Sequence, residues 1–322
     1  MENIIKYSNL LKKKTFIVWK IFMIILCLCS ISCRNIDNKF NGEKKNSEVR
    51  INFLDNKLKE SKKQSPLLYT NKIQYAKIPF NKDYTIIAAL NPEILVNRQN
   101  DAKSKVKYRV VVYNASTGKY VTQRIFIRDN NQNNVIKKLN EGKSYTFIAY
   151  SISSQSNIPD VLDKESYSQA RIENVREDLI FFKRNMTLIK GSNTLNIIEK
   201  HQYGRIIINI NAMGKNIENI DNVSLSPTYK SADLFFFRDS PHSLSYNGSL
   251  TSRKVIFSRL NQSKLISEPV VLIFPLTGEG QLNIGTLTIN GETKNNIKLD
   301  NIKIFPGGIY NLNITIKPRR NS

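Results

Sequence analysis

The sequence contains few of the residues that most catalytic and metal sites require. Its 322 residues include two histidines and one tryptophan, and all three cysteines lie between positions 27 and 33. A disulfide framework needs cysteines spread through the fold, and a structural zinc site needs clustered cysteine or histidine. Both are therefore excluded for the rest of the chain, which must fold around an ordinary hydrophobic core.

Acidic residues are also scarce relative to basic ones. The sequence has 49 Lys and Arg against 26 Asp and Glu, a formal net charge of +23, and about +19 remains once residues 1–32 are left out. The basic residues are spread along the chain, and no zinc-finger, RNP or helix-turn-helix pattern accompanies them. We therefore expect a solvated basic surface with no nucleic-acid partner, and only weak, salt-sensitive attraction to acidic glycans or lipopolysaccharide.

The cysteine-rich segment has the features of an export signal. Lysines at positions 12–14 and 20 precede an uncharged apolar run over residues 21–32. This run is shorter than the roughly 20 residues of a membrane-spanning helix, and it ends in small residues, as secretory signals do. Residues 30–33, SISC, resemble a bacterial lipobox, although Ser30 stands where leucine is usual.

We therefore predict that residues 1–32 are a lipoprotein signal peptide and that the mature chain begins at Cys33, which carries the lipid, palmitate included. An uncleaved membrane anchor and an ordinary secretory signal are the alternatives. Residues 33–65 are polar, highly charged and without periodicity. Such a segment buries too little apolar surface to offset the entropy lost on ordering, so it is predicted to be a flexible tether.

Beyond the tether, the pattern indicates an all-β protein. Runs of β-branched and aromatic residues alternate with Gly, Asn and Ser at intervals of roughly ten residues, which is typical of β-sandwiches. Turns are expected from Asn114 to Gly118 and at Asn290-Gly291, and residues 281–290 are expected to form two short strands. The predicted strands cover residues 108–114, 119–127, 143–153, 177–183, 205–210, 233–237, 254–260, 270–276, 281–290 and 310–317.

No constellation of residues in the chain indicates catalysis. His201 and His242 lie far apart in the sequence, without an acidic residue at ligand spacing, and each is expected to be a packing or hydrogen-bonding residue. The acidic pairs Glu177-Asp178 and Asp160…Asp163 lack the pattern of a calcium-binding loop. We therefore predict a protein that is not an enzyme, with no cofactor and no metal.

Four stretches resemble the fimbrillin (Mfa-like) family of bacterial surface lipoproteins and fimbrial subunits. They cover residues 139–151, 177–210, 219–235 and 273–317, and the resemblance as a whole extends over about residues 66–318. Its motifs mark turns and strand ends. The resemblance implies two tandem transthyretin-like β-sandwich domains, an N-terminal one over residues 66–200 and a C-terminal one over residues 201–322.

The same resemblance implies a function at the cell surface. It suggests a tip, anchor or accessory subunit of a fimbria or pilus, held in the outer membrane by lipid on Cys33 and acting in adhesion or assembly. In such fimbriae an N-terminal strand is cut off after an arginine, and the vacated groove accepts a strand from another subunit. Arg50 is the candidate cleavage site, with Arg98 a poorer choice. The default expectation is a strand that never leaves its sheet edge.

The last predicted strand distinguishes between fimbrial roles. Residues 310–317 alternate in polarity and are expected to complete the second sandwich, and the polar residues 318–322 cannot fill an apolar groove. We therefore expect a tip, anchor or non-polymerising member rather than a stalk subunit. The competing hypothesis is a non-polymerising surface lipoprotein that binds host or surface glycans through exposed aromatic side chains.

Overall fold

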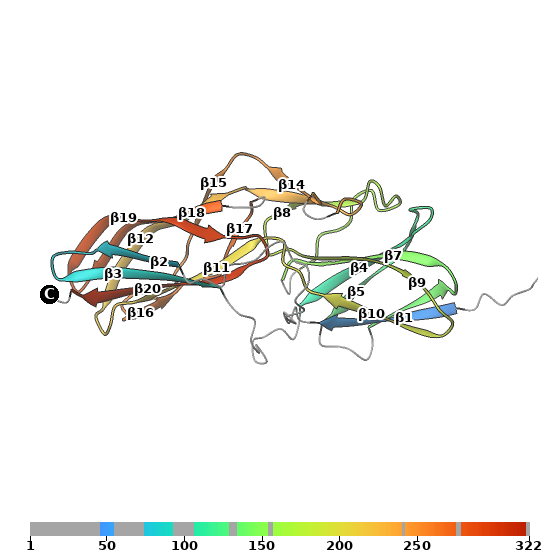
Figure 1. Cartoon of the computed structure of the whole chain (residues 1–322), viewed down its shortest axis with the longest axis horizontal. Coiled ribbons are helices and arrows are strands. Elements are labelled where there is room, and N and C mark those ends of the chain that lie inside the picture. The colour runs from blue at the N-terminus through green and yellow to red at the C-terminus, as the bar shows by residue number, and fades with distance from the viewer. Residues whose placement is uncertain are drawn as a thin grey trace, which may run out of the picture. The chain divides into compact units, whose positions relative to one another are not determined.

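The computed structural model describes residues 46–54, 74–92, 106–128, 134–153, 157–239, 242–274 and 278–319. The predicted signal peptide, Cys33 and Arg98 lie outside these residues. The described part is all-β, with twenty strands and no helix, as the sequence predicts (Figure 1). It therefore contains no helix long and apolar enough to cross a membrane.

The first sandwich is built around a sheet whose two middle strands are buried on both faces. Its strand order is β5-β4-β7-β9, with β5 at Tyr120–Ile127, β4 at Lys107–Asn114, β7 at Ser144–Ser151 and β9 at Ile180–Thr187. Val110, Val112 and Phe147 point to one core and Val111, Tyr113 and Ile148 to another. This explains the uninterrupted apolar runs in β4 and β7, because alternate side chains of these two strands enter different cores.

Two small sheets cover the faces of this central sheet. One has the order β10-β1-β6, with β10 at Ser192–Ile198, β1 at Asn46–Leu54 and β6 at Val135–Asn140. The other has the order β14-β13-β8, with β14 at Leu244–Asn247, β13 at Ser231–Phe235 and β8 at Arg171–Val175. Leu234 and Phe236 from the second cover pack against Tyr150 and Phe181 of the central sheet.

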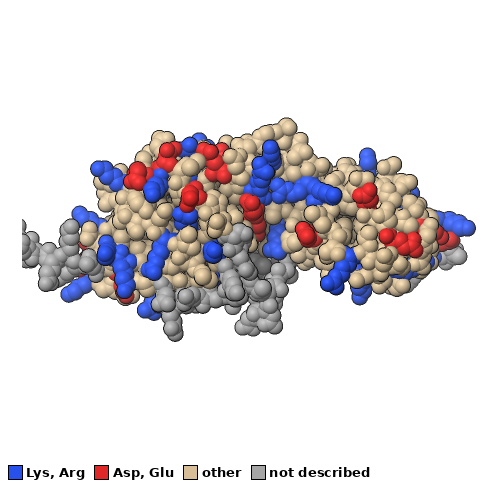
Figure 2. Space-filling view, turned by 180° about the vertical axis from the view of Figure 1, so that it is seen from behind, with Lys and Arg blue, Asp and Glu red and all other residues tan. Residues whose placement is uncertain are grey.

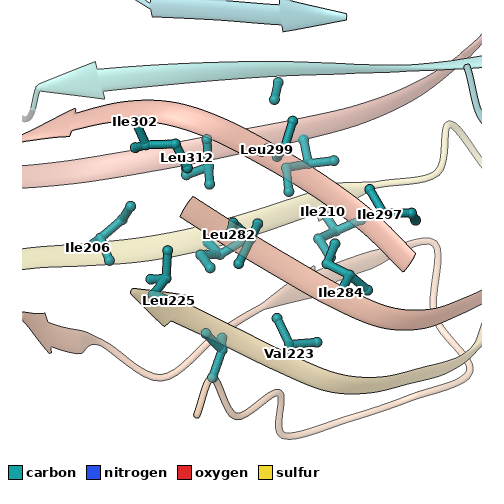
Figure 3. Close-up of a cluster of buried hydrophobic side chains, with 14 of the residues drawn as sticks. Ile206, Ile210, Val223, Leu225, Leu282, Ile284, Ile297, Leu299, Ile302 and Leu312 are labelled. Carbon is teal, nitrogen blue, oxygen red and sulfur yellow. The ribbon is translucent and has the colours of Figure 1, made fainter. Parts of the chain in front are cut away.

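The second sandwich consists of two larger sheets. One contains β16 (Lys264–Ile266), β11 (Gly204–Asn211), β20 (Ile309–Pro318), β3 (Tyr84–Pro92) and β2 (Gln74–Pro79) in that order, with β17 (Val270–Leu272) also paired to β11. The facing sheet has the order β15 (Thr251–Lys254), β12 (Ile217–Thr228), β18 (Gly278–Ile289) and β19 (Glu292–Ile304). Alternate aliphatic side chains of both sheets fill the space between them (Figure 3).

Residues 281–290 belong to one strand, not to the two short strands predicted. Leu282, Ile284, Leu287 and Ile289 are all buried, but the alternation shifts by one residue after Ile284. Asn222 on β12 and Asn296 on β19, which lie on either side of Gly285, have φ of 53° and 54°. A residue with a left-handed backbone places two successive side chains on the outer face of the sheet. The strands therefore remain paired, while the alternation of buried and exposed side chains shifts by one residue.

The predicted turns are confirmed. Gly118 has φ 67° and its amide donates to Asn114 O, while Asn290 and Gly291 both have positive φ, as a type I′ hairpin turn requires. In the Gly307-Gly308 pair only Gly307 has positive φ. Gly308 is needed for space instead, since a Cβ there would lie 2.5 Å from the ring of Tyr310.

The predicted domain boundaries differ from the observed packing in three places. Residues 46–54, assigned to the tether, form β1, in which Val49 and Ile51 are fully buried. Residues 74–92, assigned to the first domain, form the β2–β3 hairpin, whose strand β3 pairs with β20 in the second sandwich. Residues 231–247, assigned to the second domain, cover the first. The predicted boundary near residue 200 places segments that are adjacent in sequence in the same domain. The apolar faces of these hairpins are instead buried by strands that are distant in sequence.

Candidate strand-exchange site

The N-terminal strand β1 is the middle strand of its sheet. It runs parallel to β10, from Glu48 opposite Ser192 to Leu54 opposite Ile198, and antiparallel to β6. It pairs with β10 over residues 48–54 and with β6 over residues 46–50, so the prediction of a sheet-edge strand is wrong. Strands β10 and β6 do not pair with each other, so the sheet is continuous only while β1 is present.

One face of β1 completes the core between its sheet and the central sheet. Ser47, Val49 and Ile51 are at most 2% exposed, and Phe53 packs against the same cluster. Their neighbours there are Val110, Val112, Leu139, Phe147, Leu195 and Ile197. Each buried aliphatic side chain of β1 contributes roughly 1.5–3 kcal/mol by leaving water, so an empty groove would be strongly apolar.

Side-chain hydrogen bonds fix the register of β1. Ser47 Oγ donates to Ile189 O at 3.0 Å, and Asn193 Nδ2 donates to Glu48 O at 3.3 Å. Asn52 Nδ2 donates to Asn196 Oδ1 of β10 at 3.0 Å. A strand slipped by one residue would lose all three bonds and turn its apolar face outward.

A buried polar group lies at the C-terminal end of β1. Tyr108, Arg128 and Glu199, which we call the Glu199 cluster, come from β4, from the residue after β5 and from the residue after β10. Tyr108 Oη donates to Glu199 Oε1 at 2.5 Å, and Arg128 Nη1 lies 3.1 Å from the same oxygen. Burial and the Glu199 carboxylate raise the pKa of Tyr108 well above its usual range, so its hydroxyl remains a donor.

Arg50 lies in the middle of β1. Its side chain is exposed, as a protease subsite would require, but its main chain is opposite Thr194 of β10 and Val135 of β6. A protease binds its substrate as an extended segment with free main-chain groups. Cleavage after Arg50 therefore requires that β1 be open, either before the sheet forms or by local unfolding.

The C-terminal strand β20 is equally integral to the second sandwich. It lies between β11, to which it is parallel, and β3, to which it is antiparallel. Tyr310, Leu312, Ile314 and Ile316 are each at most 4% exposed. Removing β20 would divide its sheet and expose these four side chains.

The only carboxylate–histidine pair in the described residues joins two residues that the sequence analysis treated separately. His201 Nδ1 lies 2.8 Å from Asp178 Oδ1, and Ser153 Oγ donates to Asp178 Oδ2 at 3.2 Å. The serine contacts the carboxylate and not the imidazole, so the arrangement does not activate a nucleophile. Across the described ranges, no group of three His, Cys, Asp or Glu is placed to hold a metal ion.

A second surface feature lies at the end of β13. Arg238 Cζ lies 4.1 Å from the ring centre of Phe235, and Phe237 is 41% exposed. Lys183 Nζ donates to Arg238 O at 3.0 Å and lies 2.5 Å from Asp239, which fixes this turn. Sequence reasoning identified the strand 233–237 but not this surface, because the alternation of exposed and buried phenylalanines depends on the fold.

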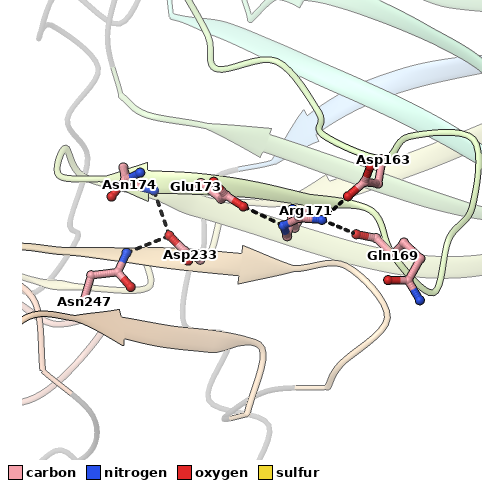
Figure 4. Close-up of polar contacts among 7 residues, drawn as sticks. All are labelled: Asp163, Gln169, Arg171, Glu173, Asn174, Asp233 and Asn247. Carbon is pink, nitrogen blue, oxygen red and sulfur yellow. Dashed lines mark hydrogen bonds and ion pairs between the residues drawn. The ribbon is translucent and has the colours of Figure 1, made fainter.

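Polar side chains continue along the outer face of the same sheet (Figure 4). Asp233 Oδ1 accepts hydrogen bonds from Asn247 Nδ2 at 2.7 Å and from the Asn174 amide at 2.8 Å. Arg171 Nε donates to Glu173 at 2.7 Å, and Arg171 also pairs with Asp163. Elsewhere, Figure 2 shows both signs of charge interspersed on the face in view, in agreement with a dispersed basic surface.

Comparison with known proteins gives similarity in structure but not in sequence. The sequence matches no family model and no curated protein. Among solved structures, it is similar to the fimbrial anchor protein Mfa2 of Porphyromonas gingivalis, at 11% identity and a TM-score of 0.38 over 78% of this chain and 100% of that one. It is also similar to a fimbrial assembly protein of Parabacteroides distasonis (9% identity, TM-score 0.39, 67% and 86% covered). A candidate cell adhesion protein of Bacteroides uniformis gives 13% identity and a TM-score of 0.44 over 70% and 95%.

Proposed function

We propose that this protein is a cell-surface lipoprotein, without enzymatic activity, that acts as a tip, anchor or accessory subunit of a fimbria. The observation that carries the proposal is the position of β1 between β10 and β6. Strand β1 is N-terminal to the other strands and is the one that joins β10 to β6, so a strand of another subunit can take its place. Main-chain pairing on both sides then supplies affinity, and the apolar groove supplies specificity.

The position of β20 supports a subunit that accepts a strand and does not donate this one. Both strands lie in the middle of a sheet, but β1 contains the candidate cleavage site Arg50 whereas no cleavage site is predicted in β20, whose departure would expose the second core. The purified mature protein, whether or not it is cut after Arg50, is therefore expected to remain monomeric on a sizing column. Long detergent-resistant homopolymers would contradict this role.

Electron microscopy of shed surface material tests the proposal directly. An antibody to this protein should label fimbriae at an end or at sparse positions along them. Labelling of isolated membrane patches, with fimbriae unlabelled in cells that make them, would overturn the fimbrial role.

Anchoring is proposed to occur through Cys33. Replacing Cys33 with Ala removes the sulfur that accepts lipid, so the protein should leave the membrane fraction or accumulate as its precursor. Replacement of Cys29, which lies inside the predicted signal peptide, serves as the control and should change neither. Membrane association and processing that survive Cys33→Ala would contradict lipidation at this residue.

A second candidate function, glycan binding, is favoured by the surface at the end of β13. Exposed Phe237, with Arg238 over Phe235, offers an aromatic platform next to the Asp233–Asn247 pair, which can hydrogen-bond to hydroxyl groups. A glycan array with the intact protein tests it. Binding that is lost in Phe237→Ala and retained in Tyr75→Ala, an exposed tyrosine on β2, would support this function.

A further inference from the structure

We infer that the Glu199 cluster retains the C-terminal half of β1, residues 51–54, independently of the N-terminal half, so that cleavage after Arg50 leaves the groove partly filled. The inference rests on the strand-exchange role proposed above and adds the device that regulates it.

Besides their pairing with β10, the Asn52–Asn196 hydrogen bond and the Ile51 amide, which donates to Asn134 O at 2.7 Å, residues 51–54 have two contacts with the cluster. The Glu199 amide donates to Leu54 O at 3.3 Å, which extends the ladder between β1 and β10 by one bond. The ring centres of Phe53 and Tyr108 lie 4.4 Å apart. One carboxylate residue therefore holds the end of β1 through its main chain, and it holds the tyrosine under Phe53 through its side chain.

The N-terminal half of β1 is held by other groups. The Glu48 amide donates to Gly191 O at 3.3 Å, Asn193 binds Glu48 O, and Ser47 binds Ile189 O. None of these groups belongs to the Glu199 cluster. Strand β10 pairs with both halves of β1, and the attachments beyond this pairing differ between the two halves.

Hydrolysis of the bond after Arg50 acts on the two halves differently. An arginine-specific endopeptidase and one water would produce a carboxylate on Arg50 and an ammonium group on Ile51. Residues 46–50 then lose their covalent link to the sandwich, whereas residues 51–54 remain joined to the chain that leads to β2. An incoming strand must still displace Ile51 and Phe53 from the core.

Burial makes the cluster a strong point of attachment. The side chains of Arg128 and Glu199 are 11% and 10% exposed, and Tyr108 is 1% exposed. Removing the charge of one member of a buried ion pair leaves the other uncompensated, which favours local opening to water. Because Glu199 is bonded to Leu54, such an opening would begin at the C-terminal end of β1.

Hydrogen exchange of the full chain tests this retention. In Glu199→Gln, amides of residues 51–54 should exchange about tenfold faster than in the unmodified protein, while those of β7 change by less than about threefold. Tyr108→Phe, which keeps the ring against Phe53, should act in the same direction but less strongly. The control Asp160→Asn removes the charge of the ion pair with Arg109, 2.6 Å away in the same sandwich, and should leave β1 unchanged. Equal acceleration in β1 and β7, or none in either cluster variant, would overturn the inference.

Uptake of a labelled peptide with the sequence of residues 46–54 separates this inference from the proposed function. The full chain is cut after Arg50, with mass spectrometry confirming the bond that is broken. Faster uptake by Glu199→Gln than by the unmodified chain supports both ideas. Equal uptake by the two overturns the retention role and leaves strand exchange standing. Local opening in Glu199→Gln with no uptake leaves retention standing and overturns strand exchange.

Discussion

Asparagine determines backbone geometry at several positions in this protein. Of the ten non-glycine residues with positive φ in the described part, six are asparagine: Asn174, Asn222, Asn261, Asn290, Asn296 and Asn301. Asparagine tolerates the left-handed region because its short polar side chain can bond locally. Asparagine thus occupies the positions at which the alternation of buried and exposed side chains shifts in β12 (Asn222) and β19 (Asn296 and Asn301).

Asn296 provides a test of this geometry. Its side chain is exposed, so Asn296→Ala should destabilise the protein by about 1 kcal/mol through the left-handed backbone alone, whereas Asn296→Gly should be nearly neutral. The neighbouring exposed Asn295, without a positive φ, is the control. Denaturant unfolding curves should separate the variants, and equal stability of Asn296→Ala and Asn295→Ala would contradict the explanation.

Buried tyrosines should make stability sensitive to alkali. Burial raises the pKa of Tyr246 to about 12, with Tyr229 adding to the shift. Burial also raises the pKa values of Tyr113, Tyr150 and Tyr203. The folded state holds these protons more tightly than the unfolded chain, so this stabilisation is complete below pH 10 and is lost as the pH rises toward 12. The denaturant midpoint should therefore fall steeply over this interval, and a flat profile would show that these phenols are solvated.

At the scale of elements, strands with runs of β-branched and aromatic residues were predictable from the sequence. Strands in which apolar residues are separated by charged and polar ones were not. Residues 108–114 and 310–317 carry β-branched and aromatic residues, and both form strands close to the predicted bounds. Strand β1 was missed because Val49, Ile51 and Phe53 are diluted by charged and polar neighbours. Its burial depends on a groove made by β6 and β10, which no local pattern reveals.

The assignment of β20 as a core strand can be tested at one side chain. Ile314 is 1% exposed and lies between Ile210 and Ala88. Ile314→Asp would bury an unpaired charge and should cost about 3–5 kcal/mol, enough to unfold the second sandwich. The adjacent Thr315 faces the other side of the sheet, so Thr315→Asp is the control and should cost less than about 1 kcal/mol. Thermal unfolding measures both, and an unchanged midpoint for Ile314→Asp would reject the assignment.

At the scale of the whole molecule, each sandwich includes a hairpin from the other half of the sequence. The first needs residues 231–247 to cover its central sheet, and the second needs residues 74–92 beside β20. A fragment of residues 46–200 should therefore lack a stable fold, because Leu234 and Phe236 are missing from its core. Circular dichroism with thermal unfolding tests this, and a cooperative transition in the fragment would contradict it.

The pairing of β3 with β20 has a consequence for how the second sandwich forms during synthesis. Partners such as Pro92 and Tyr310 are separated by 218 residues, and Tyr84 and Pro318 by 234. A two-stranded hairpin such as β2–β3 is only marginally stable alone, and pairing over such distances is slow because the loop must close first. The first strands of the second sandwich to leave the ribosome must wait for the last one. Strands β2 and β3 therefore remain without their partner in the second sandwich until β20 has been synthesised.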